Sequence, residues 1–516
     1  MIRTHLHVAS NRIRFQNRTF AMYTTRSLTI IALFASLFGG TLAGAQIPPR
    51  PEDIKFKPLQ FQPPNAKDYR HVLSNGVVVY MAPNHELPLI NLVFTFKGGS
   101  FMEPADKVGL GSAAGAMMRR GGTTTIKAGE LDEQFDFLAA QTGTFVGETT
   151  SGANLNSLSS NFNDSFKLFM DMVRNPGFQQ DRFEVLCSEV IEDLKQRNDD
   201  ADPILSREWS TLLYGADHFE ALQPTKASID SLTVDDLKNF HNRIFRPTPG
   251  SMFVAVTGDF DPDQMLKTLE DAFKGWEPGA AVSDPPAPKA ALVPGVYHVE
   301  KDIPQGKVQI GLRTIERDDP DYFAMLMMNQ ILGGGGFTSR ITNRVRSDEG
   351  LAYSAGSAFI PRVYYPGEFQ AGFQSKSATV PLATKIIMEE IEKIRTQPVT
   401  AEELEIAKNS FIETFPRTFE SKAGMLNVFV GDEITNRPAD FWQTYRDKIR
   451  AVTPEQIMDV ANRRLKPQDM AIVIVGKWDD IAPGDLQGRA SMKDFFGGNV
   501  THLPLRDPLT LEPMGN

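Results

Sequence analysis

The chain has 516 residues, of which 41% are hydrophobic and 23% are charged, an ordinary globular balance with enough length for more than one core. Residues 1–45 hold five arginines and no acidic residue, so the remainder carries 49 basic side chains against 64 acidic ones. This negative balance disfavours a nucleic-acid partner, whose phosphates attract basic surfaces. The single cysteine, Cys187, excludes an intramolecular disulfide.

The first 45 residues have the pattern of a targeting segment rather than of a folded domain. Arg26 precedes the apolar stretch 28–38, and the small residues at 43–45 suit a signal peptidase. The stretch is too short and too interrupted by glycine for a stable membrane span. We therefore expect export to the periplasm or cell envelope after signal cleavage, with residues 1–21 lying upstream of an alternative start at Met22. An arginine-rich segment without acids also suits a mitochondrial transit peptide, which is the alternative address.

The next part of the chain predicts a strand followed by helices. Residues 89–96 have the pattern of a strand, residues 109–119 of a helix, and residues 182–197 of a further helix. Cys187 lies in the last of these among apolar residues at helical spacing. We interpret it as a buried structural thiol, because no nearby histidine or basic residue would lower its pKa.

Two segments, 233–261 and 453–480, repeat one another in order. Each begins with a threonine that can cap a helix, Thr233 in one and Thr453 in the other. Each helix reaches an Asn-Arg pair and then a proline, and an apolar strand ending in glycine follows, such as Met252–Gly258. Helix, proline stop and buried strand recur in one order, which indicates an internal duplication.

The strand and helix of the first half also recur in the second, as a strand at residues 308–312 and a helix at residues 322–332. We therefore expect two homologous lobes, 66–278 and 295–516, preceded by an N-terminal extension at 46–65. The intervening residues 279–294 are rich in proline and alanine and indicate a semi-stiff linker. Because strands and helices occur in runs rather than in alternation, the predicted fold class is α+β, with two α/β-sandwich lobes.

The most specific motif is a glycine-rich segment in the second lobe. It contains Gly333, Gly334, Gly335 and Gly336. Arg346 follows, with Tyr353 seven positions later. Together with the duplication, this motif resembles the pitrilysin/insulinase (inverzincin) metallopeptidases, a family that includes mitochondrial processing peptidases and core subunits of respiratory complex III. The resemblance covers nearly all of residues 66–480.

In that family, such an arginine and tyrosine hold the substrate backbone across the catalytic chamber. The resemblance therefore implies that Arg346 and Tyr353, with the glycine run, bind a peptide. The residue types suit this role, since a carbonyl that becomes an oxyanion needs fixed donors, and a guanidinium and a phenol supply them. The alternative is that Arg346 pairs with Asp348 and that Tyr353 only packs.

The zinc motif that the family carries in its first lobe is missing. An inverted His-x-x-Glu-His places two imidazoles and a general base on one helix, and a distant acid completes the ligand set. The aligned positions hold Ser112, Gly115 and Ala116, which can neither hold zinc nor take a proton from water. The family spacing places the third ligand at Asp193. We expect this chain to bind no metal or cofactor of its own.

The resemblance implies a non-catalytic, peptide-binding subunit of a heterodimeric zinc peptidase. The partner would be a homologous subunit with an intact motif and the zinc, and the substrate an unfolded peptide. Two alternatives stay open. One is a structural scaffold without a role in proteolysis, since the core subunits of complex III show that this fold can have a purely structural role. The other is an independently active zinc peptidase that uses Ser112, Asp193 and remote histidines.

Overall fold

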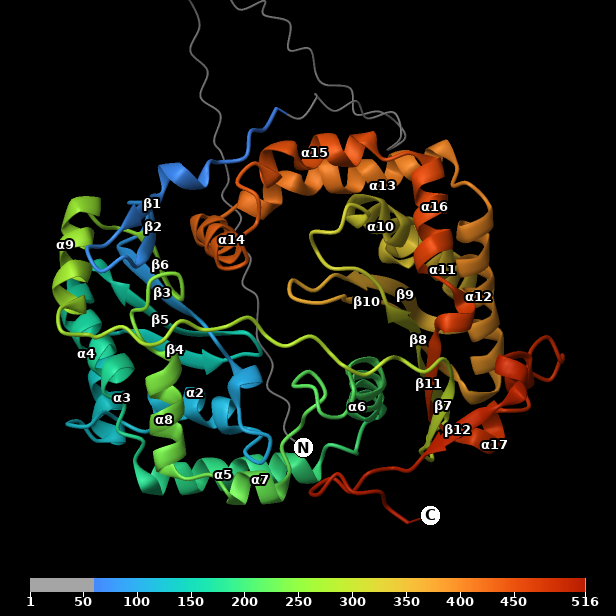
Figure 1. Cartoon of the computed structure of the whole chain (residues 1–516), viewed down its shortest axis with the longest axis horizontal. Helices are drawn as coiled ribbons and strands as arrows, with labels where there is room; N and C mark the ends of the chain where they lie inside the picture. The colour runs from blue at the N-terminus through green and yellow to red at the C-terminus, as the bar shows by residue number, and fades with distance from the viewer. Residues whose placement is uncertain (1–59, 516) are drawn as a thin grey trace, which may run out of the picture. The chain divides into compact units, whose positions relative to one another are not determined.

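The computed structural model describes residues 60–515, so the expected signal segment lies outside the described residues. These residues form two six-stranded sheets with helices around them (Figure 1). The first lobe contains β1 (Arg70–Val72), β2 (Val78–Pro83), β3 (Leu89–Lys97), α2 (Leu110–Arg120), α3 (Ala128–Phe137), β4 (Gln141–Val146), β5 (Thr150–Leu158), α4 (Phe162–Arg174), α5 (Gln180–Lys195), α6 (Ala201–Tyr214), α7 (Lys226–Asp230), α8 (Val234–Ile244), β6 (Met252–Gly258) and α9 (Pro262–Phe273). The second contains β7 (Gly295–Glu300), β8 (Gln305–Arg313), α10 (Tyr322–Asn329), α11 (Arg340–Thr342), β9 (Ala352–Ile360), β10 (Glu368–Lys376), α12 (Val380–Thr396), α13 (Ala401–Thr414), α14 (Lys422–Ile434), α15 (Phe441–Ala451), α16 (Pro454–Arg464), β11 (Ala471–Gly476), α17 (Trp478–Ile481) and β12 (Val500–Leu503).

The strand order shows that the second sheet repeats the first. The two orders are β1-β2-β6-β3-β5-β4 and β12-β7-β11-β8-β10-β9. In both sheets the second and third strands are parallel, and the remaining inner pairs are antiparallel. The two sheets differ only in the first pair of each order, since β1 is antiparallel to β2 whereas β12 is parallel to β7. The predicted α+β class with two duplicated lobes is confirmed.

Local signals set the helix starts as expected. Thr233 and Thr453 each form a capping box with the third residue of the helix that follows, and β6 covers the predicted strand. One prediction needs correction, because the helix expected at 322–332 ends as an α-helix at Asn329. It continues as a π-helical turn over Gln330–Gly334, where glycines relax the backbone.

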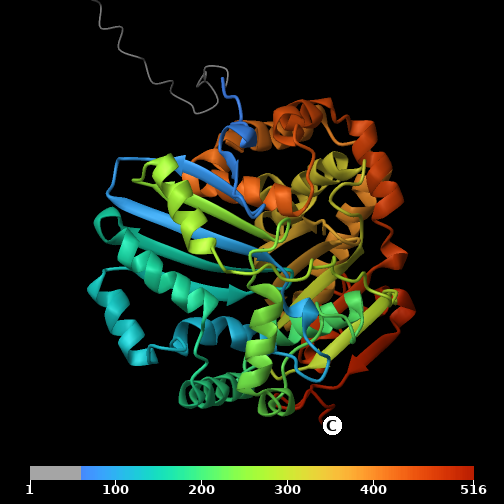
Figure 2. The ribbon, with the colours of Figure 1, turned by 60° about the vertical axis from the view of Figure 1, so that its left-hand side comes forward.

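Within each lobe, helices bury one face of the sheet (Figure 2). Along β3 the side chains alternate, and Ile90, Leu92 and Phe94 turn toward the first lobe's helices with at most 3% of their surface exposed. This period of two is what a strand with one buried face requires. In the second lobe, α12 packs in the same way against β8 and β10.

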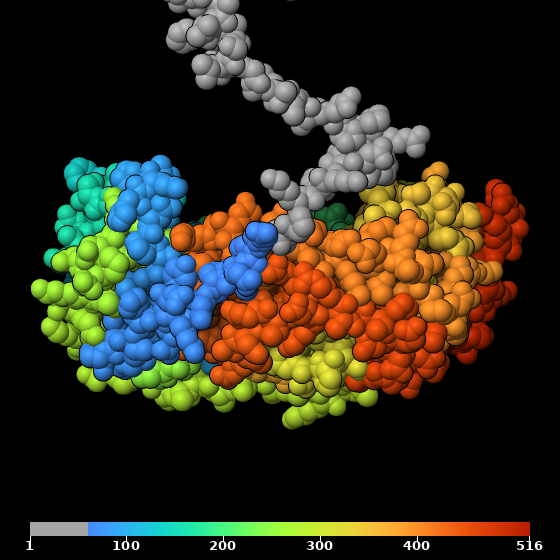
Figure 3. Space-filling view, turned by 90° about the horizontal axis from the view of Figure 1, so that it is seen from above, coloured from blue at the N-terminus to red at the C-terminus, as the bar shows by residue number. Residues whose placement is uncertain are grey.

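The opposite face of each sheet is covered by a helix from the other lobe. Helix α14 of the second lobe packs against β2 and β6, with Phe429 beside Tyr80. Reciprocally, α6 of the first lobe packs against β8 and β11, where Trp209 and Val473 share one buried cluster. In Figure 3 the first-lobe residues in blue lie directly against second-lobe residues in orange. This exchange of helices buries apolar surface from both lobes and holds them together.

The C-terminal segment makes a further tie between the lobes. After β12, Arg506 pairs with the buried Glu208 of α6 at 3.0 Å, and the carbonyl of Leu509 accepts a hydrogen bond from the Lys226 amide at 2.8 Å.

Between residues 60 and 515, no helix has the length and apolar content that crossing a bilayer requires.

Candidate functional site

Helix α2 carries the positions of the degenerate zinc motif. It begins after Gly109, whose φ of 102° is in the left-handed region. The Glu103 carboxylate accepts hydrogen bonds from the amides of Gly109 and Gly111 at 2.9 and 2.7 Å, so it caps the helix. Burial raises the pKa of Glu103, although the two amide donors oppose that shift. No local pattern in the sequence marks this carboxylate as the cap.

The three motif positions do not share one environment. Ser112 and Ala116 line a cavity of about 530 Å³, whereas Gly115 is buried against β4. A Cβ atom on Gly115 would lie 2.8 Å from the Val146 amide nitrogen and 3.1 Å from the Phe145 carbonyl carbon. The middle position therefore has no room for any side chain without movement of the strand.

The acid expected as third ligand lies outside this cavity. Asp193 is exposed and lines a shallow outer depression of α5 together with Glu189 and Glu192. The wall that α5 gives to the cavity consists of Leu186, Cys187 and Val190. Asp193 comes about two helical turns after Leu186, so it lies further along α5 and is not among the residues that line the cavity.

Cys187 also differs from its interpretation as a core residue, since it is half-buried and borders the cavity. Burial, followed by the charges of Asp230 and Glu184, raises the pKa of the thiol. A thiol with a raised pKa is a poor nucleophile at neutral pH.

Three buried histidines of the described region serve the fold. The rings of His218, His241 and His298 each have a nitrogen within 3.0 Å of a backbone carbonyl oxygen. Burial lowers the pKa of all three, that of His241 to about 4. From residue 60 to residue 515, no three histidine, cysteine or acidic side chains gather closely enough to hold a metal ion.

Arg346 and Tyr353 lie together in the second lobe. The Arg346 guanidinium carbon is 4.6 Å from the centre of the Tyr353 ring and 4.5 Å from that of Phe337, both within the range of cation–π attraction. Tyr353 is 85% exposed and Phe337 is 64% exposed. Within residues 60–515 the Arg346 side chain makes no ion pair and no hydrogen bond, so the alternative pairing with Asp348 does not occur. Phe337 had no predicted role, because nothing in the sequence shows that its ring meets Arg346.

The glycine run lies against the strand that begins beside Tyr353. Gly333, Gly334 and Gly336 line a cavity of about 490 Å³ that Arg346 also borders, whereas Gly335 does not. A Cβ atom on Gly333 would lie 2.5 Å from the Ser357 amide nitrogen of β9. Each lobe therefore packs a helical segment onto the last strand of its sheet through a glycine, Gly333 here and Gly115 in the first lobe.

Arg346 also borders an adjoining cavity of about 660 Å³, which Tyr353 lines as well. Its wall includes Asp202 and Leu205 from α6 of the first lobe, and Asp202 forms an ion pair with Lys307 of β8. The structure thus gathers all the predicted peptide-binding residues except Gly335 around two adjoining cavities. In the described part of the chain, no residue of these two cavities also lines the cavity beside α2.

Comparison with known proteins gives the same family. Residues 231–411 match the family described as peptidase M16 inactive domain. The non-peptidase homolog YmxG of Helicobacter pylori is 25% identical over 419 residues, covering 80% of this chain and 94% of that protein. An uncharacterized zinc protease YmxG of Bacillus subtilis is 22% identical over 418 residues, covering 79% and 97%.

Comparison with solved structures gives the same family. A peptidase M16 inactive domain from Pseudomonas fluorescens has a TM-score of 0.70 and 25% identity, covering 79% of this chain and 97% of its own. A protease from Helicobacter pylori has a TM-score of 0.67 at 20% identity, which shows the fold alone. The fold and these relatives agree that the chain is a member of the pitrilysin/insulinase-type (M16) family, in which the residues of the zinc motif are replaced.

Proposed function

We propose that the chain is the non-catalytic, peptide-binding subunit of an exported heterodimeric zinc peptidase. A homologous partner supplies the zinc and its ligands, and this chain supplies Arg346 and Tyr353. Export to the cell envelope rests on the N-terminal sequence pattern, with a mitochondrial location as the alternative. Activity of this chain alone with added zinc would refute the assignment.

The observation that carries the proposal is the set of contacts around the Arg346 guanidinium. A guanidinium next to two largely exposed aromatic rings, with no acidic partner among residues 60–515, keeps its donors free for another molecule. The arrangement suits a peptide carbonyl, because the donors are held in place before charge develops on the oxygen. Exposed aromatic surface next to a free cation also suits coverage by a partner or a peptide.

The partner's zinc would activate the water that attacks the peptide bond. In this chain, Arg346 and Tyr353 orient the peptide backbone and offset the negative charge on the carbonyl oxygen. An extended peptide pairs readily with the last strand of a sheet, which gives affinity through main-chain hydrogen bonds with little sequence selectivity. The last strands here are β4 and β9, and Tyr353 lies on β9.

The test is cleavage of a quenched fluorescent peptide by the purified complex of this chain with a homologue that has an intact His-x-x-Glu-His motif. Arg346→Ala should lower kcat/KM about a hundredfold, as loss of one oxyanion donor does. Tyr353→Phe, which keeps the ring and removes the hydroxyl, should give a smaller loss.

The matched control is Arg450→Ala, which removes an exposed arginine paired within its own helix. It should leave cleavage unchanged. Gel filtration of each variant checks that the complex still forms. Unchanged cleavage with both Arg346→Ala and Tyr353→Phe would favour the scaffold alternative.

A further inference from the structure

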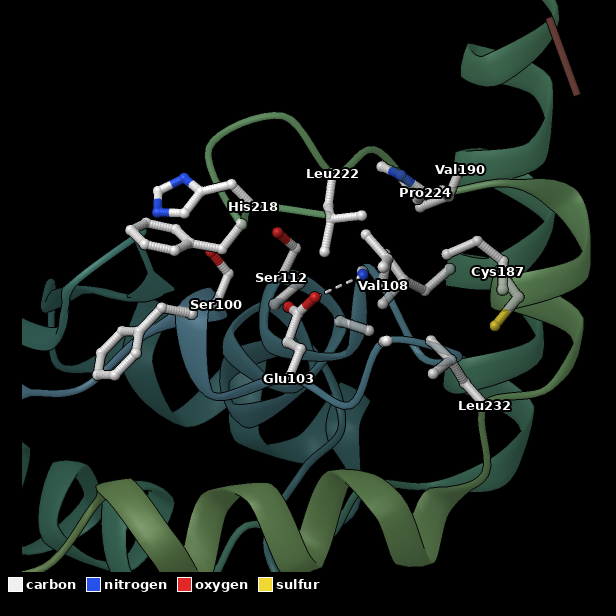
Figure 4. Close-up of a pocket in the computed structure, with 18 of the residues that line it drawn as sticks. Ser100, Glu103, Val108, Ser112, Cys187, Val190, His218, Leu222, Pro224 and Leu232 are labelled. Atoms are coloured by element: carbon white, nitrogen blue, oxygen red, sulfur yellow. Dashed lines mark hydrogen bonds between the residues drawn. The ribbon is translucent and has the colours of Figure 1, made fainter. Parts of the chain in front are cut away.

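The cavity beside α2 is mostly apolar, and Figure 4 shows its wall. Its volume of about 530 Å³ falls in the range of ligand pockets, about 300–1,000 Å³. Much of the wall consists of the aliphatic side chains of Val108, Leu186, Val190, Leu222, Ile229 and Leu232. Among residues 60–515, no lysine or arginine lines the cavity. A wall of this kind favours apolar groups that carry no negative charge.

Some polar side chains of the cavity are engaged with the backbone, and others, Ser100 among them, have no hydrogen-bond partner within the described residues. Glu103 and His218 are already engaged with the backbone, through the cap of α2 and through the Pro286 carbonyl. The Ser112 hydroxyl and the Asp217 carboxylate have no hydrogen-bond partner within the described residues, and both residues are exposed. Free acceptors of this kind match N–H donors on a ligand. A fatty acid or another anionic amphiphile fits poorly, because it would meet carboxylates and no cation.

We infer that this cavity, at the position of the lost zinc site, receives large apolar side chains of the bound peptide. The inference rests on the proposed peptide-binding role. An extended peptide directs residues i and i+2 to the same side, about 7 Å apart, and presents backbone N–H groups between them. A cavity of about 150 Å³ already holds benzene, so this one has room for two such side chains.

The first test uses two fluorescein-labelled ten-residue peptides of glycine, serine and lysine. One carries phenylalanine at two alternate positions, and the other carries alanine at both. Fluorescence anisotropy with the full chain should show at least tenfold tighter binding of the phenylalanine peptide, since burial of one such side chain is worth that factor or more.

Two variants fill the cavity from different sides. Val190→Phe narrows it from α5, and Ser112→Phe blocks it from an exposed position where a ring costs little stability. Each should remove the preference for the phenylalanine peptide. The matched control is Val185→Phe, which adds the same ring to the outer face of α5, where Val185 is 49% exposed. It should keep the preference.

Cys187 supplies an independent readout, because it borders the cavity and is the only cysteine of the chain. The saturating phenylalanine peptide should slow its alkylation by N-ethylmaleimide more than the alanine peptide does. The neutral dye N-phenyl-1-naphthylamine tests for a free small molecule as the occupant. If the dye slows alkylation and the phenylalanine peptide neither displaces it nor protects the thiol, the inference is overturned.

The results separate this inference from the proposed function. Equal affinities for the two peptides, both weakened by Arg346→Ala, would overturn the cavity's role and leave peptide binding standing. Absence of binding by either peptide, together with no effect of Arg346→Ala on partner-dependent cleavage, would overturn both. A preference that survives Val190→Phe and Ser112→Phe in folded protein would place the selectivity elsewhere.

Discussion

Restoring the inverted zinc motif with Ser112→His, Gly115→Glu and Ala116→His should give a less stable protein that still does not cleave peptides. The obstacle is the packing of α2 on β4, since a Cβ atom at position 115 would lie 2.8 Å from the Val146 amide nitrogen. Overpacking of this kind costs about 1–3 kcal/mol, and the added buried carboxylate costs more. The thermal midpoint should fall by about 6 °C or more, at roughly 2–4 °C per kcal/mol.

The matched control is the double variant Ser112→His with Ala116→His. Both side chains point into the cavity, so its thermal midpoint should stay within a few degrees of the native protein. Scanning calorimetry compares the three proteins, and a quenched-peptide assay with added zinc checks for cleavage. A triple variant as stable as the double variant would contradict the steric account of Gly115.

Arg362→Ala should lower the stability at pH 7.5 by about 3 kcal/mol, because it leaves a buried carboxylate unpaired. Arg362 of the second lobe pairs at 2.6 Å with Glu220 of the first, whose side chain is only 5% exposed. Tyr365 donates its hydroxyl proton to the same carboxylate. The expected loss of about 3 kcal/mol is at the low end of the range for breaking a buried ion pair, because 30% of the Arg362 side chain remains exposed.

The stability lost through Arg362→Ala should become smaller as the pH falls. Burial is the main cause that raises the pKa of Glu220 above its ordinary 4.5, with the charges of Glu148 and Glu368 acting in the same direction. A raised pKa means that the folded state holds the proton more tightly than the unfolded state does. The cost of burying the charge is therefore absent below about pH 4.5 and grows as the pH rises through the folded pKa.

Because Arg362 offsets that cost only while Glu220 is charged, Arg362→Ala should destabilise less at pH 4.5 than at pH 7.5. Scanning calorimetry of native and variant protein at the two pH values measures the difference. Arg450→Ala is the control, since its exposed ion pair should contribute about 0–1 kcal/mol at either pH. An equal loss for Arg362→Ala at both pH values would show that Glu220 is not the group left unpaired.

The sequence by itself determined the duplication, the fold class and the absence of zinc ligands at positions 112, 115 and 116. These features depend on short-range patterns. A capping box such as that of Thr233 acts over three residues, and a buried strand such as β6 shows its character in its own residues. The spacing of Arg346 and Tyr353 likewise lies within one short segment.

Only the tertiary structure decided which side chains meet. Asp193 has the expected spacing but is exposed and does not line the cavity beside Ser112 and Ala116. The ring of Phe337 meets Arg346 through the fold of the glycine-rich turn, and Arg362 meets Glu220 across 142 positions of sequence. Contacts of this kind depend on how whole elements pack against one another, which no local pattern encodes.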